Sequence, residues 1–116
     1  MKHAEADIQK GCVKWFRLQY PEYANLLFAV PNGGKRNRLE AARLKSEGVL
    51  SGVSDLILLV PSRNFHGLCI EMKAGKGQLT ANQMRFIKAV QKQGYAAAVC
   101  WSLDEFMDTI NHYLSQ

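Results

Sequence analysis

The sequence predicts an α/β domain in which helices flank a central mixed sheet of four strands. Three observations indicate this: some segments have apolar residues at helical spacing, others are short apolar or alternating runs, and turn residues separate the two kinds. The chain has 116 residues, 47% of them hydrophobic, which suffices for one core and not for two. We therefore expect one domain over residues 1–116, with elements in the order α-β-α-β-β-α-β-α.

The first three predicted elements are a helix, a strand and a second helix. Residues 4–19 have apolar side chains at helical spacing, and Pro21 ends that helix. Residues 26–30 are a short apolar run before a turn, which is typical of a strand. Residues 37–47 are rich in charged helix formers, and Gly48 stands where a left-handed C-cap is expected. This second helix should therefore be mostly exposed.

The next two strands are predicted to form an antiparallel hairpin. Residues 55–60 are apolar after the first position, which predicts a central strand covered on both faces. Residues 61–65 are typical of a loop, and residues 66–73 alternate in polarity. The alternation places two sets of side chains on opposite faces: Leu68, Ile70 and Met72 on one, and Cys69, Glu71 and Lys73 on the other.

The last three predicted elements are a helix, a strand and a helix. Thr80 and Gln83 form a capping box that begins the third helix. Residues 95–101 contain three consecutive alanines, which predicts an interior strand against which helices pack closely. Ser102 and Glu105 predict a second capping box before the last helix. The core face of that helix is expected to contain Phe106, Met107, Ile110, Tyr113 and Leu114.

The charge, the cysteines and the apolar runs of the sequence limit the partners, cofactors and location that we expect. The net charge of +5 favours a polyanionic partner. Cys12, Cys69 and Cys100 are odd in number and show no C-x-x-C spacing, so neither a disulfide framework nor a structural zinc site is indicated. The sequence begins without a signal peptide, and no apolar run approaches the roughly 20 residues that span a bilayer. We expect a soluble protein of a reducing cytosol, with no membrane association.

The hairpin predicts that two acids face each other. The loop pairs Val60 with His66, and counting outward places Asp55 opposite Glu71, with Cβ atoms about 4.5–5.5 Å apart. Two carboxylates at that distance repel unless a cation lies between them or one is protonated. Oxygen ligands suit Mg²⁺ or Mn²⁺. Lys73 lies on the same face and could orient water or stabilise charge on a phosphate, so the arrangement indicates phosphodiester cleavage.

A purely structural interpretation of the same residues stays open. Glu-x-Lys on one strand face is common on solvated surfaces, and an Asp after Gly-Val-Ser often only shapes a turn. The conjunction of an acid at the start of an apolar strand with an acid and a lysine at the matching place on its partner favours the catalytic interpretation.

These motifs resemble a known superfamily. Residues 52–55 (Gly-Val-Ser-Asp) and 70–73 (Ile-Glu-Met-Lys) resemble the signature of the PD-(D/E)XK nucleases, whose restriction-endonuclease-like αβββαβ core matches the predicted order with one added helix. With the turn at 31–34 and Gln83, they resemble the VRR-NUC (virus-type replication-repair nuclease) domain over almost the whole chain. Ser54 replaces a proline that this family usually has.

The resemblance implies roles for particular residues. Asp55 and Glu71 would bind Mg²⁺ or Mn²⁺ together with the backbone carbonyl of Met72, and Lys73 would orient or deprotonate the attacking water. Glu5 in the first helix corresponds to an acid that approaches the metal, although a first-turn Glu is also favoured by the helix dipole alone.

Two further assignments have structural alternatives. Gln83 corresponds to a glutamine near the family's site, yet a capping box also explains it, and we expect that one side chain cannot do both. The second assignment is a loop that would contact DNA phosphates, for which a plain turn and a solvated helix start are the alternative. The loop residues are Asn32, Gly33, Lys35, Arg36 and Arg38.

The sequence therefore predicts a divalent-metal-dependent, structure-specific DNA endonuclease. No helicase or recognition module is attached, so the chain resembles stand-alone phage and bacterial members, for which four-way (Holliday) junctions are the implied substrate. Flap or single-strand cleavage, and DNA binding without catalysis, are the alternatives. Resolving a junction needs paired cuts, which predicts a two-fold homodimer through residues 37–47 or the last helix. A monomer that cuts flaps or ends is the alternative.

Overall fold

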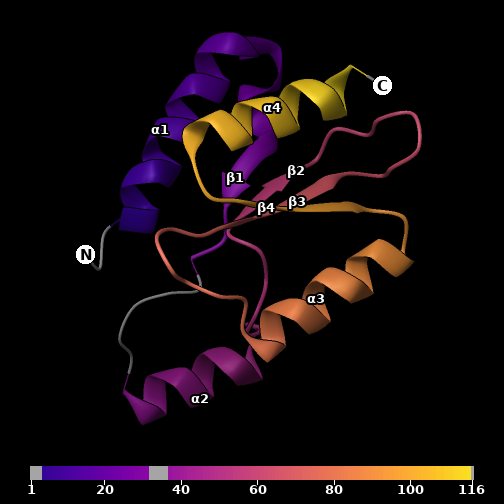
Figure 1. Ribbon diagram of the computed structural model, residues 1–116. Helices are drawn as coiled ribbons and strands as arrows, with labels where there is room; N and C mark the ends of the chain where they lie inside the picture. Colours follow the sequence, from indigo (N-terminus) through magenta and orange to yellow (C-terminus); the bar gives the residue numbers. More distant parts are fainter. Residues whose placement is uncertain (1–3, 32–36, 116) are drawn as a thin grey trace.

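A computed structural model describes residues 4–31 and 37–115 of the chain (Figure 1). The predicted order of helices and strands is confirmed, with one addition, a 3-10 helix that directly precedes the first strand. The elements are α1 (Ala4–Gln19), η1 (Pro21–Leu26), β1 (Leu27–Ala29), α2 (Arg38–Ser46), β2 (Leu56–Leu58), β3 (Leu68–Met72), α3 (Ala81–Lys92), β4 (Ala96–Cys100) and α4 (Leu103–Leu114).

The sheet is mixed and has four strands in the order β1-β2-β3-β4. The pairs β1–β2 and β2–β3 are antiparallel, and β3–β4 is parallel. The predicted interior position of β2 is confirmed, whereas the prediction of an interior β4 is wrong because β4 lies at the edge, beside β3. Its small residues are instead covered by helices, since both α3 and α4 pack against β4.

The register of the β2–β3 hairpin agrees with the sequence prediction. Leu56 pairs with Ile70 and Leu58 with Leu68, and the same register continued by one residue places Asp55 opposite Glu71. The strands are shorter than the predicted 55–60 and 66–73. Regular pairing stops at one end because Met72 N–H bonds to the side chain of Asp55. At the other end the ladder stops after Leu58, and the loop contains a separate bridge between Ser62 and Phe65.

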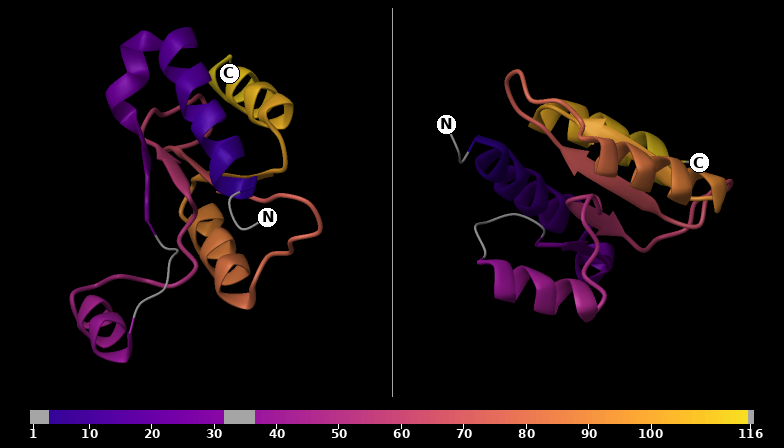
Figure 2. Two further views of the ribbon diagram at one scale, coloured as in Figure 1. Left: turned by 90° about the vertical axis from the view of Figure 1, so that its left-hand side faces the viewer. Right: turned by 90° about the horizontal axis from the view of Figure 1, so that it is seen from below.

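Helices cover the two faces of the sheet unequally. α1 and α4 pack against each other on one face, and α3 lies on the other (Figures 1 and 2). Leu59, which follows β2, is 53% exposed, so the prediction that this segment is covered on both faces is wrong at that position. The core between α1, α4 and the sheet includes Cys12, Phe16, Leu56, Leu58, Ile70, Met72, Phe106 and Ile110.

The helix ends follow the predicted capping chemistry with one change. Thr80 and Gln83 form both hydrogen bonds of a capping box at α3. At α4, Ser102 Oγ accepts the bond from Glu105 N, but Glu105 Oε1 accepts from the N–H of Trp101 at 2.7 Å, one residue earlier than predicted. No residue of α2 is buried, which confirms that this helix is exposed.

The described chain has no helix long and apolar enough to cross a membrane. Its three cysteines are buried free thiols, as their spacing predicts. Burial, reinforced by the nearby Cys100 thiol, raises the pKa of Cys12 to about 12. Cys12 is therefore a packing residue of the core at neutral pH.

Replacing Tyr113 with Phe is expected to lower the free energy of unfolding by about 1–3 kcal/mol, the cost of a buried polar group without a partner. Tyr113 is buried, and its hydroxyl donates a 2.7 Å hydrogen bond to the carbonyl of Val60. Urea unfolding would measure the difference. Tyr20→Phe is the control, because Tyr20 donates to Asn111 at a solvent-accessible place where water can substitute. Equal losses of unfolding free energy in the two variants would contradict the conclusion that burial makes the Tyr113 hydrogen bond the more important one.

Candidate active site

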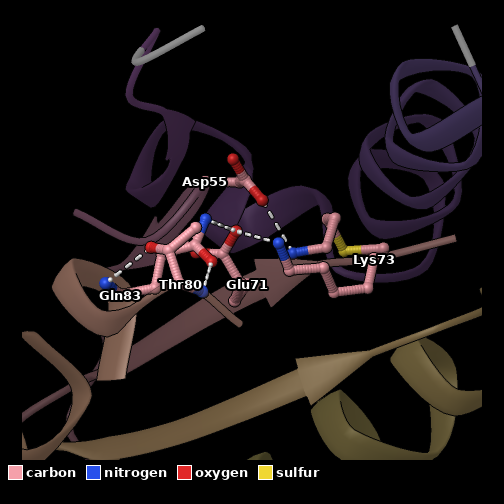
Figure 3. A network of polar contacts seen from close by, with 6 residues as sticks. Asp55, Glu71, Lys73, Thr80 and Gln83 are labelled. Atoms are coloured by element: carbon pink, nitrogen blue, oxygen red, sulfur yellow. Dashed lines mark hydrogen bonds and ion pairs between the residues drawn. The ribbon is translucent and has the colours of Figure 1, made fainter. Parts of the chain in front are cut away.

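Two acids, a lysine and a glutamine meet where β2 begins and β3 ends (Figure 3). Asp55 directly precedes β2, Glu71 is in β3, and Lys73 follows β3. Gln83 comes from the first turn of α3, on the face of the sheet opposite α1 and α4. The antiparallel pairing of β2 and β3 brings the start of one strand to the end of the other, so residues far apart in sequence share this corner.

The carboxylate of Asp55 is held by the backbone of β3. Its Oδ2 accepts a 2.7 Å hydrogen bond from the N–H of Met72. In an extended strand the N–H and C=O of one residue point to the same side. The carbonyl of Met72 therefore also points toward Asp55, as its predicted role as a metal ligand requires.

The carboxylate of Glu71 is buried and only partly satisfied. The residue is 2% exposed, and its Oε2 accepts a 2.9 Å hydrogen bond from Nε2 of Gln83. The same oxygen lies 4.0 Å from Nζ of Lys73, which is itself 7% exposed. Its Oε1 is buried and has no hydrogen-bond partner. A buried carboxylate oxygen without a partner costs free energy, which indicates a place for a ligand.

Loss of solvent is the main cause that raises the pKa of Glu71 to about 8, followed by the negative charge of Asp55 and by hydrogen bonding of protonated Glu71 to the Asp55 side chain. The ammonium of Lys73 acts in the opposite direction, and Glu5 adds a smaller upward effect. A divalent cation between the acids would remove their repulsion and give Oε1 of Glu71 a partner. Two carboxylates and a carbonyl are oxygen donors of the kind that Mg²⁺ and Mn²⁺ prefer, so the residues present fit such an ion.

Gln83 has two roles at once, and the expectation that one side chain cannot do both is wrong. Its Oε1 accepts a 2.9 Å hydrogen bond from the N–H of Thr80, which completes the capping box. Its Nε2 donates to Glu71. The amide has an acceptor and a donor on different atoms, so capping α3 also orients the donor toward the acid.

Gly52 determines how closely the segment before Asp55 approaches α3, a contact that sequence reasoning missed. Gly52 has a φ of +95°, and a Cβ there would lie 2.5 Å from the backbone carbonyl atoms of Asn82. The side-chain amide of Asn82 also donates to Ser51 Oγ at 3.1 Å. The available signal was the glycine three residues before Asp55, but its contact with α3 depends on tertiary structure.

Glu5 and Arg38 are the remaining predicted site residues that the structure describes. Glu5 is exposed in the first turn of α1, near enough to raise the pKa of Glu71. Within residues 4–31 and 37–115, no three His, Cys, Asp or Glu side chains form a cluster that could hold a metal. Arg38 is exposed at the start of α2. The other predicted DNA contacts, Asn32, Gly33, Lys35 and Arg36, lie outside the described residues.

Ser54 stands where the family usually has proline. It is buried, and its hydroxyl has no hydrogen-bond partner. A proline at this position would therefore lose no side-chain hydrogen bond.

The mixed sheet with an acid pair and a lysine at its corner defines a protein of the nuclease-like α/β class. The VRR-NUC domain family matches residues 3–104, so the chain belongs to that family and is a nuclease domain. A solved structure described as a VRR_NUC domain protein is similar to it with a TM-score of 0.84 and 29% identity, covering 96% of this chain and 88% of that chain. No curated protein matches the chain in sequence.

Glu71→Gln is expected to stabilise the metal-free protein at pH 8 much more than at pH 5. The folded pKa of about 8 lies above the ordinary 4.5, so the folded carboxyl holds its proton more tightly than the unfolded one. The wild-type free energy of unfolding therefore falls as pH rises from 4.5 to 8, by about 1.4 kcal/mol for each pH step of one within that interval. Glutamine has no such proton and can still accept the bond from Gln83.

Urea unfolding of both proteins in EDTA at the two pH values would measure this effect. A difference between variant and wild type that stays constant with pH would show that Glu71 does not titrate in this range. Asp108→Asn, the same acid-to-amide change at an exposed position of α4, serves as the control and should leave the pH dependence unchanged.

Proposed function

We propose that this nuclease domain is a divalent-metal-dependent DNA endonuclease whose reaction takes place at Asp55, Glu71 and Lys73. The observation that supports this most strongly is the buried Oε1 of Glu71, which lacks a partner beside a second acid. Without a cation the two acids repel each other unless Glu71 holds a proton, so the pair is unfavourable in its ionised form. A non-catalytic DNA-binding role, the main alternative, would not need this costly arrangement.

Asp55, Glu71 and the carbonyl of Met72 would hold Mg²⁺ or Mn²⁺, with Glu5 as a further candidate from α1. The bound ion would lower the pKa of its water and neutralise charge that develops on the phosphate. Asp55 is fixed by the N–H of Met72 and Glu71 by Gln83, so both acids are oriented before any ligand arrives.

Lys73 would orient the attacking water and stabilise the negative charge of the phosphate. Its ammonium lies 4.0 Å from Glu71 Oε2, with most of its side chain removed from solvent. An ammonium in a low-dielectric place interacts more strongly with a phosphate than one in water. The net charge of +5 suits DNA, and the predicted phosphate contacts at residues 32–38 would add to it.

We further propose branched DNA, such as a four-way junction, as the substrate, with flap or single-strand cleavage as the second candidate. A junction needs two symmetric cuts, and the site formed by Asp55, Glu71 and Lys73 would make one of them (Figure 3). A two-fold homodimer would supply the second site. The three buried free thiols suit a reducing compartment such as the cytosol.

Asp55→Ala, Glu71→Ala and Lys73→Ala are each expected to reduce DNA cleavage by at least about 100-fold, the scale of losing one group that stabilises transition-state charge. Each variant should stay folded, because these side chains are not part of the apolar core. Cleavage of labelled DNA with Mg²⁺, Mn²⁺ or EDTA would test this. Asp108→Ala, an exposed acid on α4, is the control and should cut normally. Full activity of Glu71→Ala, or cutting in EDTA, would refute the site.

Three exposed apolar residues on α2 and the turn after it are candidate dimer contacts: Leu39, Val49 and Leu50. Leu39 is 84% exposed and Leu50 59% exposed. The double variant Leu39→Glu with Leu50→Glu is expected to sediment as a monomer. It should lose paired cutting of junctions but still cleave single-stranded DNA. Leu18→Glu on α1 is the control, because Leu18 is also highly exposed. A wild-type protein that stays monomeric with junction DNA would contradict the dimer and leave the nuclease assignment intact.

A further inference from the structure

The helices of this domain differ sharply in charge. α3 has three cations and no acid between Ala81 and Lys92. α4 has three acids, Asp104, Glu105 and Asp108, and its only basic residue is His112. The two helices lie on opposite faces of the sheet (Figures 1 and 2). The excess positive charge is therefore not spread evenly, and the face with α3 is the more positive of the two.

The cations of α3 form one stripe, which we call the α3 stripe: Arg85, Lys88 and Lys92. All three are exposed and line a single shallow depression together with Ala89 and Gln91. Spacings of three and four residues place them on the same side of the helix. The rise along the helix from Arg85 to Lys92 is about 10 Å, close to three phosphate steps of one DNA strand at about 3.4 Å each along the duplex axis.

Hydrogen bonds from the first turn of α3 connect the helix that carries the α3 stripe to the candidate active site. Gln83, two residues before Arg85, donates its hydrogen bond directly to Glu71. Arg85 also contacts the side chain of Asn82, which is bonded to Ser51 in the segment before Asp55. The first turn of α3 therefore contacts Glu71 and the segment before Asp55, and the stripe continues along the same helix.

Another helix with exposed cations, α1, is placed differently. It has Lys10, Lys14 and Arg17 on its exposed side, but its first turn contains Glu5 and Asp7. It packs with α4 on the opposite face of the sheet from α3. Its cations are therefore separated by acids from the corner where Glu71 lies, whereas α3 has no acid between its stripe and that corner.

We propose that the α3 stripe binds the phosphate backbone of the DNA strand next to the bond that is cut, and so positions that bond at the acid pair. This interaction rests on the proposed nuclease function and assigns the DNA-contacting helix within it. Flexible ammonium groups on one helix side bind phosphates without reading bases, so the contact fixes position and not sequence.

A matched pair of variants tests the assignment. Lys88→Gln with Lys92→Gln removes two lysines spaced by four residues on α3, and Lys10→Gln with Lys14→Gln removes two lysines with the same spacing on α1. Both variants lose the same charge. Affinity for a labelled duplex would be measured by fluorescence anisotropy over a range of salt concentrations, with Ca²⁺ in place of Mg²⁺. The α3 pair should reduce the slope of log affinity against log salt by about 1.8, and the α1 pair should leave it unchanged.

Lys88→Arg with Lys92→Arg should restore the slope, because it keeps both charges; a loss through misfolding would not be restored in this way. Equal changes in the α3 and α1 pairs would mean that only net charge matters and would overturn the assignment, as would no change in either. Wild-type protein that does not bind DNA at all would refute the proposed function itself, which is a distinct result from binding that is insensitive to α3.

Discussion

The burial of the Glu71 carboxyl beside Asp55 is the constraint on which the rest of this structure depends. A carboxylate that is 2% exposed loses its hydration, and a second negative charge nearby makes its ionisation harder still. The protein compensates only in part, through one hydrogen bond from Gln83 and the ammonium of Lys73. The unsatisfied oxygen that remains is unfavourable for stability and suits a site that binds a cation, which is a usual compromise at functional sites.

The first turn of α3 holds Gln83 in the orientation from which it donates its hydrogen bond to Glu71. The capping bond from Thr80 fixes the backbone and the amide of Gln83 together, so the donor to Glu71 is oriented by the same contacts that begin the helix. Close packing at Gly52 brings the preceding segment against Asn82 and sets where Asp55 enters β2. The cap of α3, the close contact at Gly52 and the acid pair are therefore linked through the first turn of α3.

The distribution of charge has a physical consequence for a nucleic-acid partner. A net charge of +5 would attract the proposed DNA substrate from a distance in any orientation, but an acidic α4 on one face and a basic α3 on the other would favour one of those orientations. Association would then be fastest when the face with Gln83 and Glu71 meets the duplex. The asymmetry thus links the overall charge of the domain to the position of its acid pair.

The sequence by itself determined the order of the elements, the hairpin register that aligns Asp55 with Glu71, and the exposure of α2. These features depend on local chemistry: period-two alternation and loop length specify a register, and a run of charged helix formers specifies an exposed helix. The resemblance to the VRR-NUC family rested on motifs spread over almost the whole chain, and the family match over residues 3–104 confirms it.

Only the tertiary structure decided that β4 lies at the sheet edge, that Gln83 serves both its helix and Glu71, and that Gly52 touches α3. The apolar composition of a segment predicts that the segment is covered, but it does not predict whether a strand or a helix covers it. A side chain's second hydrogen bond and a glycine's close contact depend on groups brought near by folding from distant parts of the chain. Those distances are set by how the layers pack, which local sequence does not encode.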